Sequence, residues 1–135
     1  MLKVVLDTNV LVSAVISPTG PPARVLELAA DGAFQLIVSP PIIAEYEGVL
    51  ARRRFGLSVG TVHAIVASIR KLSIEIVPSE PLAYCRDPGD DKFLACACAT
   101  GAEFLVTGNA RHFPRLFQGV RIVPPAIFLR EIERP

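Results

Sequence analysis

The chain has 135 residues, of which 51% are hydrophobic and 20% are charged, and its formal net charge is +1. This composition excludes a disordered chain and predicts one globular domain, residues 1–135, with a buried core. The small net charge creates no long-range field for a polyanion, so a nucleic acid would have to be bound by a local patch. The apolar runs are shorter than a membrane span and no export leader is evident. We therefore expect a cytoplasmic protein without a membrane segment.

Short apolar runs alternate with segments of helical periodicity along the whole chain. The expected strands are residues 3–6, 34–38, 74–77, 104–107 and 120–123. The expected helices are residues 10–16, 22–30, 42–54, 59–72, 91–100 and 126–132. This order predicts an α/β fold, a three-layer α/β/α sandwich with a central, mostly parallel sheet of four to five strands. The helix at 91–100 is apolar on nearly every side, so we expect it to be buried.

Acidic residues stand where these elements would meet at one edge of the sheet. Asp7 follows the first strand, Glu45 lies early in the helix after the second, and Asp91 opens the apolar helix beside Asp87 and Asp90. In open α/β sheets, ligands bind at the carboxyl ends of the strands. Carboxylates gathered there repel one another unless a cation compensates, and Mg²⁺ or Mn²⁺ prefers such oxygen ligands. The sequence therefore predicts a divalent metal site that could activate water against a phosphodiester.

Each of these residues also has a structural interpretation. Thr8 could simply cap the following helix, and Glu45 could be a solvated carboxylate on a helix surface. Asp87 and Asp90 are residue types common in turns and at helix N-termini. Asn109 could occupy a left-handed turn, which Asn tolerates.

Basic residues supply candidates for contacts to phosphate. Arg111, His112 and Arg115 follow the strand at 104–107 and are expected near the acidic edge, where they could position an RNA backbone. The run Arg52–Arg54 is expected at a helix C-terminus, where cations favour the helix dipole, so we assign it a structural role.

Three segments resemble motifs of the PIN domain family of metal-dependent ribonucleases, many of which are toxins of bacterial type II toxin–antitoxin pairs. The segment VVLDTNVLVSA resembles the first motif, VSPPIIAEYEGVL the second, and DPGDDKFLACACATGAEFLVTGN the third together with the fourth position. The resemblance implies that the metal ligands are Asp7, Glu45 and Asp91, and that Asn109 completes the catalytic set. It implies supporting roles for Thr8, Asn9, Asp87, Asp90 and Thr107. The fourth position is often Asp in the family, and the uncharged Asn109 favours one metal ion over two.

The resemblance further implies a Mg²⁺- or Mn²⁺-dependent endoribonuclease that acts on RNA as a homodimer and is inhibited by a small antitoxin. The segment SPTGPPARVLEL is expected to border the apolar groove that the antitoxin covers. The alternative is a catalytically weakened PIN-fold module that binds RNA or protein. The uncharged Asn109 is evidence for this alternative, and the presence of Asp7, Glu45 and Asp91 is evidence against it. A phosphatase with Asp7 as nucleophile is disfavoured, because Asn9 stands where a second carboxylate would act as general acid. A dinucleotide-binding protein is disfavoured because no glycine-rich turn follows the first strand.

Overall fold

The computed structural model describes residues 1–133, so the last two residues of the predicted domain, 134–135, lie outside the described residues. The strands are β1 (Lys3–Leu6), β2 (Gln35–Val38), β3 (Ser73–Glu75), β4 (Phe104–Val106), β5 (Leu116–Phe117) and β6 (Val120–Val123). The α-helices are α1 (Thr8–Ile16), α2 (Pro21–Ala30), α3 (Pro40–Leu50), α4 (Val59–Leu72), α5 (Asp91–Thr100) and α6 (Pro125–Ile132). Single 3₁₀ turns are formed by η1 (Arg53–Phe55), η2 (Pro88–Asp90) and η3 (Ala110–His112).

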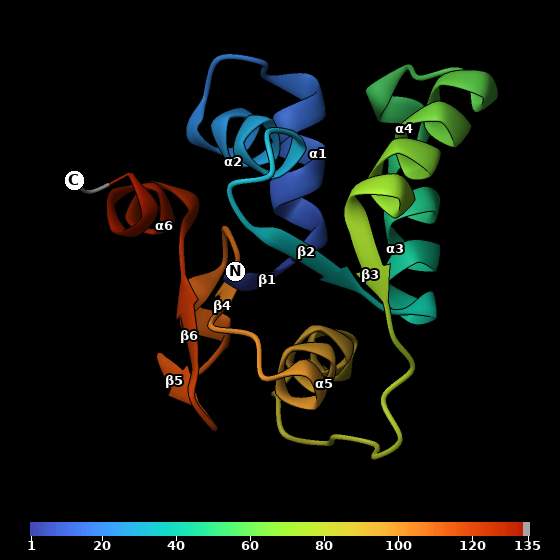
Figure 1. Ribbon diagram of the computed structural model, residues 1–135. Helices are drawn as coiled ribbons and strands as arrows, with labels where there is room; N and C mark the ends of the chain where they lie inside the picture. Colours follow the sequence, from blue (N-terminus) through green and yellow to red (C-terminus); the bar gives the residue numbers. More distant parts are fainter. Residues whose placement is uncertain (134–135) are drawn as a thin grey trace.

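The strands form one sheet in the order β3-β2-β1-β4-β6-β5 (Figure 1), parallel from β3 to β6 and antiparallel between β6 and β5. Two hydrophobic clusters cover its two faces. One contains the inner side chains of α3, α4 and α5, and the other contains those of α2 and α6 around Phe128. Helix α1 contributes Leu11 to the first cluster and Val10 to the second. The predicted three-layer α/β/α sandwich with a mostly parallel sheet is confirmed.

The sheet has six strands, whereas the sequence predicted four to five. The additional strand, β5, has two residues and pairs with β6 through a two-residue turn, with Phe117 opposite Val120. Both turn residues, Gln118 and Gly119, have positive φ angles of 50° and 86°. Such turns match the twist of a hairpin, but a strand of this length has no hydrophobic period that a sequence pattern could detect.

The helix predicted at 42–54 is displaced towards the N-terminus. Helix α3 begins at Pro40, because proline fits the first turn, where a helix has no donor to lose. It ends at Leu50, and Arg53 and Arg54 belong to the separate turn η1, which Gly56 closes at a φ of 66°. The prediction that Arg52–Arg54 ends a long helix is therefore wrong in detail, since these residues follow α3 rather than belong to it.

Helix α5 is buried, as its apolar sequence predicted. Phe93, Leu94, Cys96 and Ala97 are at most 1% exposed, and the helix packs against the sheet within the first cluster. Burial of each large apolar side chain contributes roughly 1.5–3 kcal/mol, so α5 is firmly fixed and the loop that precedes it is held at the sheet edge. Within residues 1–133, no helix has the length and apolarity to cross a bilayer.

Candidate functional site

Asp7 lies at the point where β1 passes into α1, and its side chain is turned towards β4. The residue is 7% exposed and is the N-cap of α1 by position. Its shortest side-chain hydrogen bond comes from the Thr107 hydroxyl, which donates to Oδ2 at 2.7 Å, while Asn9 Nδ2 lies 3.4 Å from the same oxygen. The carboxylate is thus fixed between the carboxyl ends of two neighbouring parallel strands.

The residues around Asp7 are themselves held in place. Thr107 is fully buried and its hydroxyl accepts a hydrogen bond from the backbone N–H of Asn109 at 3.0 Å. Asn9 Oδ1 accepts from the backbone N–H of Gly108 at 2.9 Å, and a Cβ on that glycine would lie only 3.3 Å from Asn9 Oδ1. The side chain of Asn109 is exposed and lines a separate hollow of about 250 Å³ beside α1. Thr107 and Asn9 therefore orient Asp7, and Asn109 assists through its backbone.

Glu45, on α3, has both carboxylate oxygens engaged. The Thr8 hydroxyl donates a hydrogen bond to Oε2. The Lys92 ammonium, on α5, lies 2.6 Å from Oε1 in an ion pair whose side chains are 21% (Lys92) and 30% (Glu45) exposed. Thr8 and Lys92 therefore fix Glu45 at the sheet edge, where it is not a freely solvated carboxylate.

The consecutive acids of the loop before α5 point in different directions. Asp91 Oδ1 accepts hydrogen bonds from the backbone N–H groups of Cys85 and Tyr84, at 2.7 and 3.1 Å. Burial acts to raise the pKa of Asp91, but these two hydrogen bonds outweigh it and hold the pKa below its ordinary value. Asp87 accepts a hydrogen bond from the N–H of Gly89 at 2.8 Å and is the N-cap of η2. This is the structural role that its residue type suggested.

Asp90, rather than Asp91, is electrostatically coupled to Asp7. Burial raises the pKa of Asp90, and the negative charge of Asp7 adds to the rise. Burial also raises the pKa of Asp7, where the Glu45 carboxylate adds to the effect and the hydrogen bond from Thr107 opposes it. Carboxylates affect one another in this way only at short range. The charge of Asp7 thus acts on Asp90, and the charge of Glu45 acts on Asp7; we call these three residues the acidic cluster.

Basic side chains stand directly beside the acidic cluster. A cavity of about 450 Å³ is lined by Arg86, Asp87, Asp90, Arg111 and His112. Two of the three predicted phosphate contacts, Arg111 and His112, therefore reach the site.

Arg115 lies outside this cavity, and its carbonyl accepts a hydrogen bond from Ile122 in the β5–β6 region. Sequence reasoning did not single out Arg86, which lines this cavity, or Lys92, which contacts Glu45. The available signal was that both residues flank the acids at 87–91, but Glu45 is distant from Lys92 in the sequence.

The donor chemistry of the acidic cluster fits a divalent metal ion. Carboxylate oxygens are the ligands that Mg²⁺ and Mn²⁺ prefer, and mutually repelling carboxylates are stabilised by a shared cation. Among residues 1–133, however, no three His, Cys, Asp or Glu side chains converge closely enough to form a ready-made ligand set. Among the described residues, Glu45 is the member of the cluster that an ammonium contacts, so Asp7 and Asp90 are better placed to receive an ion.

A second surface feature is an apolar groove of about 600 Å³ between α1, α2 and α4. Leu11, Leu26 and Ile65 contribute to it from the three helices, and Pro18 lies at its edge. The segment SPTGPPARVLEL, which supplies Pro18 and Leu26, does border an apolar groove.

The three-layer fold is that of an α/β protein with a mostly parallel sheet, and acidic residues lie at the carboxyl ends of its central strands. Residues 3–111 match the family model described as PIN domain, and the chain belongs to this family. Over 111 residues the chain is 31% identical to the uncharacterized protein MJ1680 of Methanocaldococcus jannaschii, a match that covers 80% of this chain and 71% of that protein.

The structure is also similar to a chain in the crystal structure of VapBC2 from Rickettsia felis bound to a DNA fragment from their promoter. The TM-score is 0.63 at 19% identity, and the match covers 90% of this chain and 97% of that chain. At this identity the likeness shows the shared fold.

Proposed function

We propose that the protein is a Mg²⁺- or Mn²⁺-dependent endoribonuclease that hydrolyses phosphodiester bonds of RNA. Membership of the PIN domain family supports a nuclease. The observation that carries the proposal is the buried carboxylate of Asp7, which Thr107 orients at the sheet edge while the neighbouring Thr8 holds Glu45. The charge of Asp7 also raises the pKa of Asp90 in the loop before α5. When bound there, a divalent ion supplies Lewis-acid chemistry that activates water and neutralises the charge developing on phosphate.

The residues of the cluster take different parts in this chemistry. Asp7 and Asp90 would hold the ion. Thr107 and Asn9 keep the Asp7 carboxylate in one orientation through their hydrogen bonds to it. Glu45 is held at the same edge by the Thr8 hydroxyl and the Lys92 ammonium. Such pre-oriented groups cost little reorganisation during the reaction.

The adjoining cavity would hold the RNA backbone. Arg86, Arg111 and His112 line the same cavity as Asp90, so a phosphate bound to them would lie beside the acidic cluster. Contacts of this kind position a nucleic acid without reading its sequence. They also release counterions, so binding should weaken as salt concentration rises.

The test is cleavage of a structured RNA pool by the purified protein with Mn²⁺, with Mg²⁺ or with a chelator. Asp7→Asn and Asp90→Asn remove negative charge from the cluster, and each should reduce the rate by at least about a hundredfold, as expected for loss of a group that acts in the transition state. Asp31→Asn, which changes an exposed carboxylate after α2, is the matched control and should cleave as wild type. Equal cleavage by all four proteins would identify a contaminating nuclease and refute the proposal.

The apolar groove is the proposed docking site of a small antitoxin. Among the described residues that line it, Glu27 is the one with a charged side chain, so the groove suits the apolar face of an amphipathic helix. The similarity of the fold to a chain of VapBC2 supports such a partner. A small antitoxin co-expressed with the protein should form a stable complex, which Ile65→Glu should abolish and Leu116→Glu, on exposed β5, should not.

A module that binds RNA without cleaving it is the second candidate. The observation in its favour is that the carboxylates of residues 1–133 form no ready-made set of three metal ligands. RNA binding by the folded protein with no metal-induced thermal shift and no cleavage would establish this candidate in place of the nuclease.

A further inference from the structure

The loop before α5 carries the one exposed aromatic side chain among the described residues. Tyr84 is 55% exposed, whereas the other tyrosine and the phenylalanines of residues 1–133 are buried or partly buried. Its ring lies against that of Phe117 on β5, with the ring centroids 4.5 Å apart and the ring planes inclined by 52°. Phe117 therefore supports the Tyr84 ring from one side, and more than half of Tyr84 remains open to solvent.

The backbone on both sides of this contact is held in place. The N–H groups of Tyr84 and Cys85 donate to Asp91 Oδ1, at 3.1 and 2.7 Å. Figure 1 shows the segment between β3 and α5 passing along α5 towards the side of the sheet where β5 lies. Phe117 is fixed in turn by its pairing with Val120 of β6. The exposed ring is thus pre-oriented, so contact with a ligand costs little conformational entropy.

The exposed ring is close to the cavity lined by Arg86, Arg111 and His112. Tyr84 and Arg86 are two residues apart, so at most about 7 Å separates their Cα atoms. Within residues 1–133, neither Arg86 nor Arg111 forms an ion pair, so both guanidinium groups are available to an anion. An open aromatic ring beside free cations is the combination that binds single-stranded nucleic acids, because each nucleotide brings both a base and a phosphate.

We propose that the ring of Tyr84 is a stacking surface for an unpaired base of RNA whose phosphates lie in the adjoining cavity. The substrate class of the site is then single-stranded RNA, since bases paired in a duplex are already stacked and cannot reach the ring. Every base has a π-face, so the contact tolerates different sequences. This inference rests on the proposed function, because it specifies which form of RNA the same site takes.

The contact with Phe117 also fastens the loop before α5 to the β5–β6 hairpin, and this packing has to be separated from stacking. Tyr84→Leu keeps an apolar side chain against Phe117 but removes the π-face. Tyr84→Phe keeps both the packing and the π-face. A purely structural role predicts that Tyr84→Leu changes thermal stability alone, whereas a stacking role predicts a loss of affinity that depends on the base.

The experiment measures binding of dye-labelled RNA by fluorescence anisotropy, with a chelator present so that the RNA stays intact. The ligands are a single strand, an abasic ribose–phosphate strand of the same length and a duplex. Wild type should bind the single strand at least about fivefold more tightly than either of the others. Tyr84→Leu should weaken binding of the single strand by about five- to a hundredfold and leave binding of the abasic strand unchanged, and Tyr84→Phe should bind as wild type.

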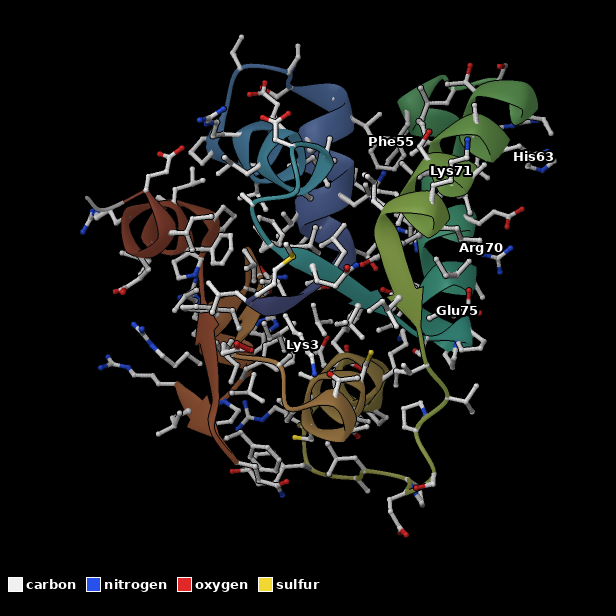
Figure 2. All side chains as sticks on the ribbon, in the orientation of Figure 1. Lys3, Phe55, His63, Arg70, Lys71 and Glu75 are labelled. Carbon is white, nitrogen blue, oxygen red and sulfur yellow. The ribbon has the colours of Figure 1, made fainter. Side chains whose placement is uncertain are left out.

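Matched controls test the ring and the charge separately. Phe55→Leu should bind as wild type, because Figure 2 shows Phe55 near α4, away from β5, and the Arg54 guanidinium lies 4.8 Å from its ring centroid. Arg86→Gln should weaken binding of the single strand and of the abasic strand alike and reduce the salt dependence of binding, as expected for a phosphate contact. Lys71→Gln, which changes an exposed lysine on α4, should leave both unchanged.

Fluorine NMR of protein labelled with 3-fluorotyrosine observes the contact directly. The chain has two tyrosines, and Tyr46 is buried, so it reports any change in the core. The Tyr84 resonance, assigned with Tyr46→Phe, should shift when the single strand binds and should not shift with the abasic strand. The Tyr46 resonance should stay in place with either ligand.

Several results would overturn the inference and leave the proposed function standing. These are equal affinity of wild type for the single strand and the abasic strand, equal affinity for the duplex, an unmoved Tyr84 resonance in the RNA complex, and wild-type affinity of Tyr84→Leu. Absence of RNA binding by wild type would also overturn it. The separate assay of metal-dependent RNA cleavage then decides the proposed function, because cleavage does not depend on which residue stacks on a base.

Discussion

Replacement of Asp91 by Ala tests whether this residue holds the loop before α5. The side chain accepts hydrogen bonds from the N–H groups of Cys85 and Tyr84, at 2.7 and 3.1 Å. A hydrogen bond to a charged group contributes about 1.5–3 kcal/mol, and water can replace part of it at the half-exposed loop. We expect Asp91→Ala to lower the free energy of unfolding by about 2–3 kcal/mol in urea titrations. For a chain of this length the corresponding fall in Tm is roughly 6–12 °C.

The stability that the Asp91 carboxylate contributes should depend on pH, and the pKa shift gives the direction of that dependence. Because the pKa of Asp91 is lowered in the folded protein, its contribution to stability is present above the ordinary pKa of the group, near 4. The contribution disappears as the pH falls through the lowered value. The difference in unfolding free energy between wild type and Asp91→Asn should therefore be constant near neutrality and shrink below about pH 4.

Asp90→Asn is the matched control, because it alters the neighbouring carboxylate of the same loop. It should leave the unfolding free energy at pH 7 unchanged or slightly higher, because burial raises the pKa of Asp90, while it abolishes Mn²⁺ binding. Asp91→Asn should retain Mn²⁺ binding at temperatures where the variant is folded. The reasoning is refuted if Asp91→Ala unfolds as wild type does but no longer binds the ion.

Three further changes probe the fold around the site. In a chelating buffer, Asp7→Asn should raise the unfolding free energy at pH 7 by about 0.5–2 kcal/mol, because the folded state buries a carboxylate whose pKa is raised, and this gain should vanish below the ordinary pKa. Phe128→Ala should cost about 3–5 kcal/mol in urea unfolding, since the ring is fully buried and contacts Phe34 edge-on at 5.1 Å. Tyr46→Phe should cost about 1–2 kcal/mol, because its hydroxyl donates to the buried carbonyl of Leu6 at 2.5 Å. An Asp7→Asn variant less stable than wild type, or losses below 1 kcal/mol in Phe128→Ala, would contradict these assignments.

The order of the elements and the class of fold could be predicted because they depend on local patterns. Each of these patterns spans only a few neighbouring residues. Examples are the apolar run before Asp7, the helical periods and the prolines at the starts of helices. Parallel strands then bring their carboxyl ends to one edge whatever the details of packing, so the meeting of Asp7 with Glu45 followed from the topology. The resemblance to the PIN domain family was accordingly visible in the sequence and confirmed by the family match.

The choice among the acids before α5 required the tertiary structure. Successive residues at the start of a helix point about 100° apart, so Asp90 and Asp91 cannot face the same partner, and a sequence lists them without their directions. The backbone N–H groups of residues 84–85 bind Asp91, whereas Asp90 is the acid of this loop whose pKa the charge of Asp7 helps to raise.

The pairing of Lys92 with Glu45 likewise became visible only in the tertiary structure. The two residues lie on different helices, and no local pattern records that their side chains meet at 2.6 Å. The sequence by itself determined which residues reach the edge of the sheet. Only the tertiary structure decided which of them face one another, because direction at that edge depends on the packing of segments distant in the chain.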